Sequence, residues 1–410
     1  MPHCTVHESH SEQPLKILFV IGSLSLGGAE QQMSLLVEHL CVRGHNCHIF
    51  VLDGSGPLRK RLVSAGAIVH EFGWDQRYGR SPRLLRLFRP MWAMVNLWRI
   101  ASRIRPDVLH AYLPLTNLMG AIAGRVARVP KVVTCRRGLG THQDRYPTFR
   151  YLDRLANAAS DVVVANSEAV ARDTSVRDHI DPNKLRVIRN GLDLARFEPR
   201  SDVAVIRQEL GLGYSEVGLV SVANLIAYKG HRELLTAIGL VANLPIRAFL
   251  IGRDDGIQLE LALLASELGI ADRVHFLGSR TDVPRLLPAL DIFVLASHEE
   301  GSSNALLEAM ASGLSVIATD VGGNRESLAE GEFGILVPAK DPEALADAIK
   351  TVLSTSETKA GLNSRIMDFL RLCYPVDSMV EAYLALYRSD VDEHCQKASS
   401  RPKWRRHQAV

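Results

Sequence analysis

The sequence is short of the features that would set it apart from an ordinary globular protein. Its 410 residues include six cysteines, none in a Cys-x-x-Cys pair, so neither a disulfide framework nor a common zinc motif is predicted. The formal net charge is only +3, which gives no indication of nucleic-acid binding. No apolar run reaches the ~18 residues of a membrane span, and residues 1–14 lack the apolar core of a secretory signal. These absences favour a cytoplasmic protein without a metal site.

The chain is too long for one compact core, so we expect two domains. Short apolar segments alternate with helical segments, which is typical of a parallel sheet with helices on both faces. The turn-rich stretch at 189–200 separates two such series. We therefore predict an α/β fold of two doubly wound, Rossmann-like domains. The expected strands are 16–21, 48–52, 108–111, 132–135 and 162–165, then 218–222, 248–251, 274–277, 292–295 and 315–318.

The alternation also predicts how the chain is divided. A helix at 372–388 follows the second series and could cross back to the first domain. The predicted segments are an N-terminal tail (1–14), an N-terminal domain (15–195), a C-terminal domain (196–371), the C-terminal helix (372–388) and a basic tail (389–410).

Gly27 and Gly28 lie between the first expected strand and a helix expected at 29–43. Glycines let backbone amides approach an anion, and a helix N-terminus favours negative charge. The spacing is not that of the Gly-x-Gly-x-x-Gly dinucleotide motif, which argues against a nicotinamide cofactor. A tight strand-to-helix turn would need the same glycines, so this motif alone leaves both interpretations open.

Two acidic residues flank the start of another expected helix. Glu300 precedes it in a loop, Glu308 lies inside it, and Ser302 or Ser303 can cap it. Carboxylates suit sugars because they accept hydrogen bonds from hydroxyl groups. Lys229 follows the expected strand at 218–222, where it could neutralise a phosphate. On pattern alone, solvated side chains are the commoner explanation for all three charged residues.

Taken together, these segments resemble the family 4 retaining glycosyltransferases, which have the GT-B fold of two domains facing a central cleft. The resemblance covers residues 16–388 and is carried by GGAEQQ, VANSEAV, RVIRNGLDLARF, SVANL with KGH, and above all EEGSSNALLEAMASG. It implies transfer of a sugar from a nucleotide-sugar, expected to be a UDP-sugar, to a glycan or lipid-linked acceptor. Retention of configuration, no metal, no cofactor and a place in bacterial surface polysaccharide synthesis are implied with it.

The resemblance also implies roles for single residues. Glu308 would hold the donor ribose, Glu300 would contact the transferred sugar, and Lys229 would contact the diphosphate. In the N-terminal domain, the acceptor side, the glycine loop would face that diphosphate. The remaining implied donor contacts are Gly27, Gly28, Asn224, Ser302, Ser303 and Asn304.

Two positions depart from the family pattern. Asn224 stands where many members have an arginine, so the diphosphate loses a charge partner unless another arginine replaces it. A His-x-His pair of many members is here His110 and Tyr112, which makes His110 a catalytic candidate and Tyr112 an acceptor contact. These departures keep a weakly catalytic partner subunit open as an alternative. A nucleotide-sugar epimerase on a similar two-domain fold is a second alternative, because it would bind the same donor without an acceptor. The candidate replacements, which could contact phosphate or acceptor, are Arg136, Arg137 and Arg253.

Positive charge is concentrated in one stretch of the N-terminal domain. Seven arginines and two tryptophans lie between Arg80 and Arg105, and no acidic residue does. Arginine and tryptophan suit an anionic membrane surface, and a lipid-linked acceptor would explain the stretch. We therefore expect a peripheral protein on the inner face of the cytoplasmic membrane, the alternative being a solvated basic helix.

Overall fold

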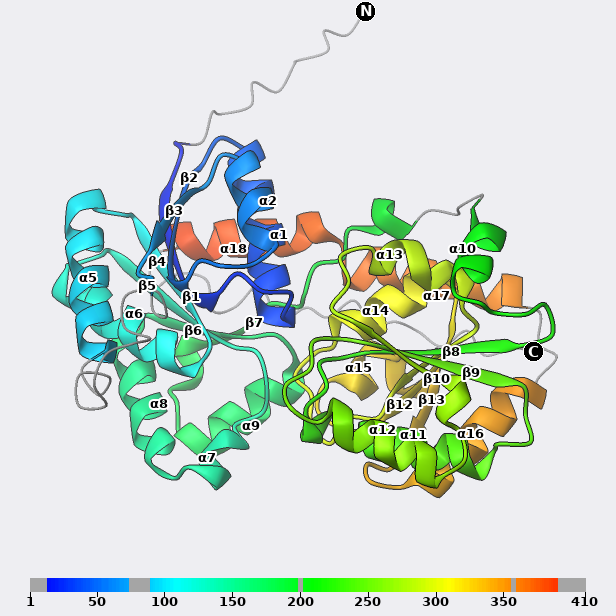
Figure 1. Cartoon of the computed structure of the whole chain (residues 1–410). Coiled ribbons are helices and arrows are strands. Elements are labelled where there is room, and N and C mark those ends of the chain that lie inside the picture. Colours follow the sequence, from blue (N-terminus) through cyan, green and yellow to red (C-terminus); the bar gives the residue numbers. More distant parts are fainter. Residues whose placement is uncertain (1–12, 74–88, 198–201, 355–358, 390–410) are drawn as a thin grey trace, which may run out of the picture.

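The computed structural model describes residues 13–73, 89–197, 202–354 and 359–389 (Figure 1). They form two parallel sheets, one with the strand order β3-β2-β1-β4-β5-β6-β7 and one with the order β10-β9-β8-β11-β12-β13. Helices cover both faces of each sheet. This arrangement confirms the predicted α/β fold with two doubly wound domains.

The N-terminal sheet is buried on both faces. Alternate residues of its first strand enter different cores, Phe19 and Ile21 on one side and Leu18 and Val20 on the other. A strand covered on both faces has no polar side, so it reads as a continuous apolar run. The strands are β1 (Lys16–Ser23), β2 (Asn46–Asp53), β3 (Ile68–Glu71), β4 (Val108–Tyr112), β5 (Lys131–Arg136), β6 (Val162–Ala165) and β7 (Leu185–Val187).

Two helical layers enclose this sheet. One contains α1 (Gly28–Val42), α2 (Leu58–Ser64) and α18 (Val376–Arg388). The other contains α5 (Arg89–Ile104), α6 (Pro114–Val126) and α8 (Thr148–Ala159). The short α7 (His142–Arg145) precedes α8, and α9 (Glu168–Asp178) follows β6.

The C-terminal sheet repeats the plan. Its strands are β8 (Val217–Val222), β9 (Ile246–Ile251), β10 (Val274–Gly278), β11 (Ile292–Leu295), β12 (Ser315–Thr319) and β13 (Ile335–Val337). One face is covered by α11 (His231–Leu240), α12 (Gln258–Glu267) and α16 (Pro342–Ser354). The other carries α13 (Val283–Leu286), α14 (Asn304–Ala311) and α17 (Lys359–Cys373). The short helices α10 (Val203–Glu209) and α15 (Asn324–Ser327) complete the domain.

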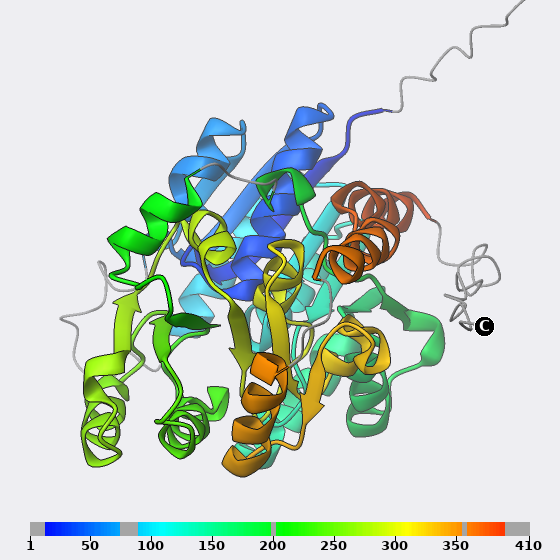
Figure 2. The same cartoon turned by 90° about the vertical axis from the view of Figure 1, so that its right-hand side faces the viewer.

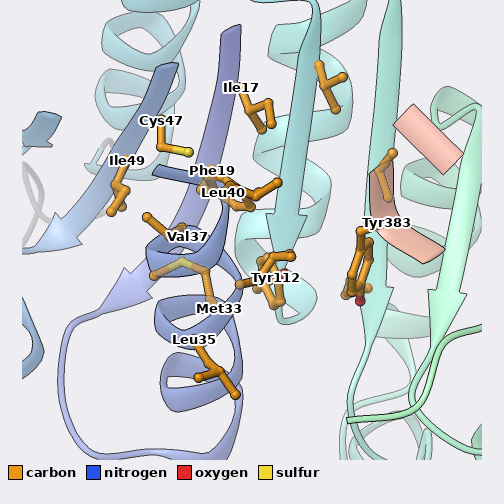
Figure 3. Packing of buried hydrophobic residues seen from close by; sticks show 14 of the residues in the cluster. Ile17, Phe19, Met33, Leu35, Val37, Leu40, Cys47, Ile49, Tyr112 and Tyr383 are labelled. Atoms are coloured by element: carbon orange, nitrogen blue, oxygen red, sulfur yellow. The ribbon is translucent and has the colours of Figure 1, made fainter. Parts of the chain in front are cut away.

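The last helix leaves the C-terminal domain and packs on the N-terminal one. The Leu192 amide donates to the Tyr374 carbonyl over 2.8 Å, where the two crossing segments meet. From there α18 runs beside α1 (Figure 2) and places Tyr383 in the same core as Tyr112 and Met33 (Figure 3). The chain therefore passes between the domains twice. The domain limits given above stay a prediction.

Two features bear on the expected membrane contact. No helix in the described part of the chain is both long enough and apolar enough to span a bilayer. Arg80, Arg83 and Arg86 of the basic stretch lie outside the described residues, as do residues 1–12 and 390–410 of the two predicted tails.

Candidate active site

A cleft of about 820 Å³ opens between the two sheets, at the carboxyl ends of their strands. Ligands of open parallel sheets bind at this edge, where loops and helix N-termini converge. Most of the residues predicted from the sequence line it: Gly27, Gly28, Arg137, Asn224, Lys229, Arg253, Glu300, Ser302, Ser303, Asn304 and Glu308.

The N-terminus of α14 lines the cleft at the point where the two domains meet. The Ser303 hydroxyl accepts a hydrogen bond from the Leu306 amide (3.3 Å), so Ser303 caps the helix, as predicted for Ser302 or Ser303. The Asn304 side-chain nitrogen, Nδ2, donates to the Gly28 carbonyl across the cleft (3.0 Å). Gly301 lies so close to the Arg137 carbonyl that a Cβ there would be 2.3 Å away. The loop that contains Gly28 and the loop that contains Arg137 therefore both reach the N-terminus of α14, a site that favours anions.

Lys229 and Glu300 form an ion pair in the cleft. The Lys229 Nζ to Glu300 Oε1 distance is 2.6 Å, and the Ser297 hydroxyl donates to the same carboxylate oxygen over 2.7 Å. Burial lowers the pKa of Lys229, but the Glu300 carboxylate outweighs it and leaves that pKa raised. The next residue, Gly230, has a φ of 68° and would place a Cβ 1.9 Å from the Ala296 carbonyl. The sequence Lys-Gly therefore positions a charged ammonium beside Glu300.

Glu308 lies on α14 and faces the cleft from the C-terminal domain. Burial raises the pKa of its carboxyl group to about 7, against the opposing effect of Arg196. Near neutral pH this group is therefore a mixture of its charged and uncharged forms. A ligand that donates hydrogen bonds to Glu308 would favour the carboxylate.

Two side chains that bridge the domains were not singled out from the sequence. Gln32 of α1 donates to the Asn304 side-chain oxygen of the C-terminal domain (3.1 Å) and also pairs with the Gly191 carbonyl (2.9 Å) and amide (3.0 Å). Asn190 donates to the Ser302 carbonyl (3.1 Å) and to the Asn304 side chain (2.7 Å). The Asn-Gly pair at 190–191 indicates a turn, and nothing local signals that it also positions the start of α14.

The three arginines proposed as charge partners have different surroundings. Arg253 lines the cleft, but its guanidinium already donates two hydrogen bonds to the Asp255 carboxylate, from Nε (2.7 Å) and from Nη2 (3.2 Å). Arg137 also lines the cleft and donates to the Asn190 side-chain oxygen over 2.6 Å. Its guanidinium also lies 5.2 Å from the centre of the Tyr112 ring, beside Cys135, and no acidic side chain of the described residues pairs with it.

Arg136 was expected to contact phosphate or acceptor, but this expectation was wrong because Arg136 does not line the cleft. Its guanidinium is buried between the carboxylates of Asp153 (2.8 Å) and Asp178 (2.9 Å), beneath α8. Arg136 is the last residue of β5 and lies under α8, whereas Arg137 follows the strand and lines the cleft, so the two arginines cannot share one role.

His110 and Tyr112 require the same correction, because both are fully buried and neither lines the cleft. The His110 ring lies between Cys135 Sγ (2.9 Å) and the Tyr387 hydroxyl (2.7 Å). Burial, assisted by the Arg137 charge, holds the pKa of His110 well below its usual value. The ring is covered by α18, so it does not reach a ligand in the cleft, and its assignment as a catalytic residue is withdrawn.

The described residues contain no cluster of three or more His, Cys, Asp or Glu side chains that could hold a metal ion. The expected independence of metals and cofactors stays a prediction.

Comparison with known proteins follows the same division of the chain. The model of glycosyltransferase family 4 matches residues 26–196, and the model of group 1 glycosyl transferases matches residues 216–355. The chain is 28% identical over 371 residues to the N-acetyl-alpha-D-glucosaminyl L-malate synthase of Bacillus anthracis, covering 88% of this chain and 94% of that protein. It is 30% identical over 307 residues to the D-inositol 3-phosphate glycosyltransferase of Mycobacterium avium, covering 70% of each.

Solved structures share the fold. A crystal structure of HepE from Anabaena, in complex with UDP and glucose, superposes with a TM-score of 0.81. That comparison covers 92% of this chain and 100% of HepE at 24% identity. The matches to both domains and to the arrangement of the sheets agree with the motifs, and the chain belongs to the family 4, group 1 glycosyltransferases with the GT-B fold.

Proposed function

We propose that this protein is a retaining glycosyltransferase that moves a sugar from a UDP-sugar to an anionic glycan or lipid-linked acceptor, in bacterial surface polysaccharide synthesis. The observation that carries the proposal is the convergence of Lys229, Glu300, Glu308 and the α14 N-terminus on one cleft. Known relatives support the setting, since one is a lipopolysaccharide core glycosyltransferase of Rhizobium meliloti.

A UDP-sugar suits the chemistry of the cleft. Glu308 would accept hydrogen bonds from the ribose hydroxyls, and Lys229 with the amides near Gly28 would bind the diphosphate. HepE was crystallised with UDP-glucose, and a relative of Escherichia coli is named for a UDP-Gal donor. Asn224 supplies no charge because its carboxamide is neutral. Its side-chain oxygen accepts from the Arg253 backbone amide (3.2 Å), and its carbonyl accepts from His231 (3.0 Å).

The reaction breaks the bond between the anomeric carbon and the phosphate oxygen, and it forms a bond from that carbon to an acceptor oxygen. Negative charge develops on the leaving diphosphate, where the Lys229 ammonium and the α14 amides stabilise it. Positive charge develops on the sugar, beside the Glu300 carboxylate. The acceptor proton passes to the leaving phosphate on the same face, which retains the configuration. These protein charges perform the electrostatic work without a metal in this proposal.

The first test is a screen of nucleotide-sugars for protection against thermal unfolding. A bound donor raises the apparent stability by mass action, so a UDP-sugar should raise the Tm most. Free epimerised nucleotide-sugar, formed without any acceptor product, would instead favour the epimerase alternative.

Donor binding is expected to depend on the ionisation of Glu308. Ribose hydroxyls bind the carboxylate better than the protonated acid, so UDP affinity should rise about five- to tenfold between pH 6 and pH 8. The direction follows from the raised pKa of about 7, since most Glu308 is protonated below it and charged above it. Calorimetry at both pH values would check this. Glu308→Gln should retain only the change due to UDP's own phosphate, and an equal pH dependence in both proteins would contradict the assignment.

An anionic group on the acceptor would complete the environment of Arg137. A buried guanidinium without a carboxylate is costly, and Arg137 carries its charge at the wall of the N-terminal domain. Relatives are named for acceptors that contain malate, inositol phosphate and a lipid diphosphate, all of them anionic.

Replacing Arg137 with methionine is therefore expected to raise the KM for such an acceptor by roughly 10–100-fold, because a charged hydrogen bond is lost. UDP release would be measured with L-malate, inositol 3-phosphate and an undecaprenyl diphosphate sugar, and Arg128→Met at the exposed end of α6 is the matched control. A matching loss of UDP affinity would instead assign Arg137 to the donor diphosphate. An unchanged KM would contradict both roles.

A further inference from the structure

His142 brings an imidazole ring to the N-terminal wall of the cleft. It is the first residue of α7, it follows the loop that contains Arg137, and it lines the cleft. Its side chain is 30% exposed, and its Nε2 atom lies 2.8 Å from Oδ2 of Asp153 on α8. The ring also packs edge-on against Phe149, with the ring centres 5.6 Å apart. One side of the ring is therefore fixed by the protein, while another part of it is accessible.

Asp153 determines which nitrogen of His142 carries a hydrogen. Burial opposes the charge of Asp153, but the hydrogen bond from His142 and the charge of Arg136 outweigh burial and lower the pKa of Asp153 to about 2. A charged carboxylate has no hydrogen to donate, so the hydrogen between the two groups belongs to Nε2 of His142. In the neutral ring, Nδ1 therefore carries the lone pair.

A buried ionic network keeps Asp153 in place. The Arg136 guanidinium lies 2.8 Å from Asp153 and 2.9 Å from Asp178, and both carboxylates are 2% exposed. Gln143 donates to each carboxylate over 2.8 Å, and Asn157 of α8 donates to Asp178 over 2.8 Å. Removing one member of a buried ion pair is strongly unfavourable. The network thus gives His142 a rigid support, in the way that a carboxylate behind a ligating histidine fixes the ring and its tautomer.

The second ring nitrogen is open to a ligand. No group of the described residues forms a hydrogen bond with Nδ1 of His142, and this atom is not one of the enclosed polar atoms. Arg137, five residues earlier, lines the same cleft and carries a positive charge. One loop therefore offers a cation and a hydrogen-bond acceptor side by side in sequence. The proposed donor residues Lys229 and Glu300 belong to the other domain, which leaves this wall to the acceptor.

We propose that His142 binds the acceptor, with Nδ1 accepting a hydrogen bond from an acceptor hydroxyl group near the anionic group that Arg137 holds. The inference rests on the proposed function, because it concerns the same cleft and the same reaction. It narrows the acceptor class to molecules that carry a hydroxyl group and an anionic group close together, such as a hydroxy acid or a sugar phosphate. The acceptor proton that is transferred in the reaction still passes to the leaving phosphate.

The experiment measures acceptor binding to the complex of the full chain with UDP, which has no sugar to transfer. Calorimetry at pH 8 would use L-malate, inositol 3-phosphate and N-acetylglucosamine 1-phosphate, each of which has a hydroxyl and an anionic group. His142→Gln keeps an amide that can donate to Asp153 but has no atom in place of Nδ1. It should weaken binding of the tightest of the three probes by roughly three- to tenfold and leave UDP affinity unchanged.

Two further variants make this result specific. His142→Asn places a carboxamide oxygen near the position of Nδ1, so it should recover part of the lost affinity. The matched control is His39→Gln, because His39 is also 30% exposed and lies 3.8 Å from the carboxylate of Asp377, but it does not line the cleft. It should bind the probe like the wild type.

A His142→Gln protein that binds the probe normally would overturn the proposal, as would an equal loss in the His39 variant or a wild-type complex that binds none of the probes. If His142→Gln unfolds early, nitrogen-15 NMR of the histidine-labelled wild type decides. The Nδ1 resonance of His142 should be that of a lone-pair nitrogen and should move when the probe is added; a hydrogen on Nδ1, or an unmoved resonance, overturns the proposal.

The two ideas fail in different ways. Probe binding that depends on His142, without sugar transfer to any acceptor, would contradict the proposed function and leave the acceptor contact intact. Sugar transfer whose KM for the acceptor is the same in His142→Gln and the wild type would contradict the contact and leave the proposed function intact.

Discussion

Replacing Lys229 with methionine is expected to lower kcat for sugar transfer by roughly 10²–10³-fold while changing the affinity for the intact UDP-sugar by less than about tenfold. Lys229 is 2.6 Å from Glu300, and that contact keeps the amine protonated inside the cleft. Its charge matters most when the diphosphate departs with its full negative charge, because an interaction that strengthens in the transition state raises turnover and not only binding. Steady-state kinetics and calorimetry with the intact UDP-sugar, without acceptor, measure both quantities on the same preparations.

The control for this variant is Lys350→Met, which removes an exposed lysine paired with Asp347 on α16. It should leave both quantities unchanged. Because the Lys229 variant leaves Glu300 without its partner, Lys229→Met with Glu300→Gln should be compared with each single change. A Lys229 variant that loses affinity for the intact UDP-sugar as much as turnover would show that the lysine only binds the donor.

Replacing Arg136 with methionine is expected to lower the free energy of unfolding by about 3–5 kcal/mol. The change leaves Asp153 and Asp178 buried together without the cation that lies within 2.8 and 2.9 Å of them. Urea unfolding of the variant measures the loss. Arg232→Met, which breaks an exposed pair with Glu260, should cost less than about 1 kcal/mol.

The ionic network also has a pH signature. The pKa of Asp153 is lowered to about 2 in the folded protein, so its stabilising effect is present above the unfolded value and is lost as pH falls toward 2. The Arg136 variant should lose most of this acid dependence. A variant as stable as the wild type at neutral pH would show that the network does not hold α8.

The central strands could be predicted because burial on both faces leaves a continuous apolar signature. All ten expected strands are present in the structure. Three further strands, β3, β7 and β13, were not predicted. The missed strands are short, and most of their residues are only partly buried. The helix at 372–388 was expected, but its packing against α1 depends on the tertiary path of the chain, which its own sequence does not specify.

The site could be predicted only where one segment carries the chemistry. The stretch from Glu300 to Glu308 combines a loop, a cap and a helix, so its geometry is local. Glu300 was expected in the loop and Glu308 in the helix, and the structure has both there. Arg136 and His110 were misjudged because the elements that cover them, α8 and α18, are distant in sequence. The inward position of Asp153 on α8 could not be predicted for the same reason, since a helix alone does not show which of its faces is inside.

Retaining transfer from a UDP-sugar is tested most directly by the anomeric configuration of the product. The donor that gives the greatest thermal protection would be incubated with the purified chain and an anionic acceptor, and the new linkage would be assigned by proton NMR. We expect a lengthened acceptor in which the sugar keeps the anomeric configuration that it had in the donor. A product of opposite configuration, or an altered nucleotide-sugar with no product on the acceptor, would contradict it.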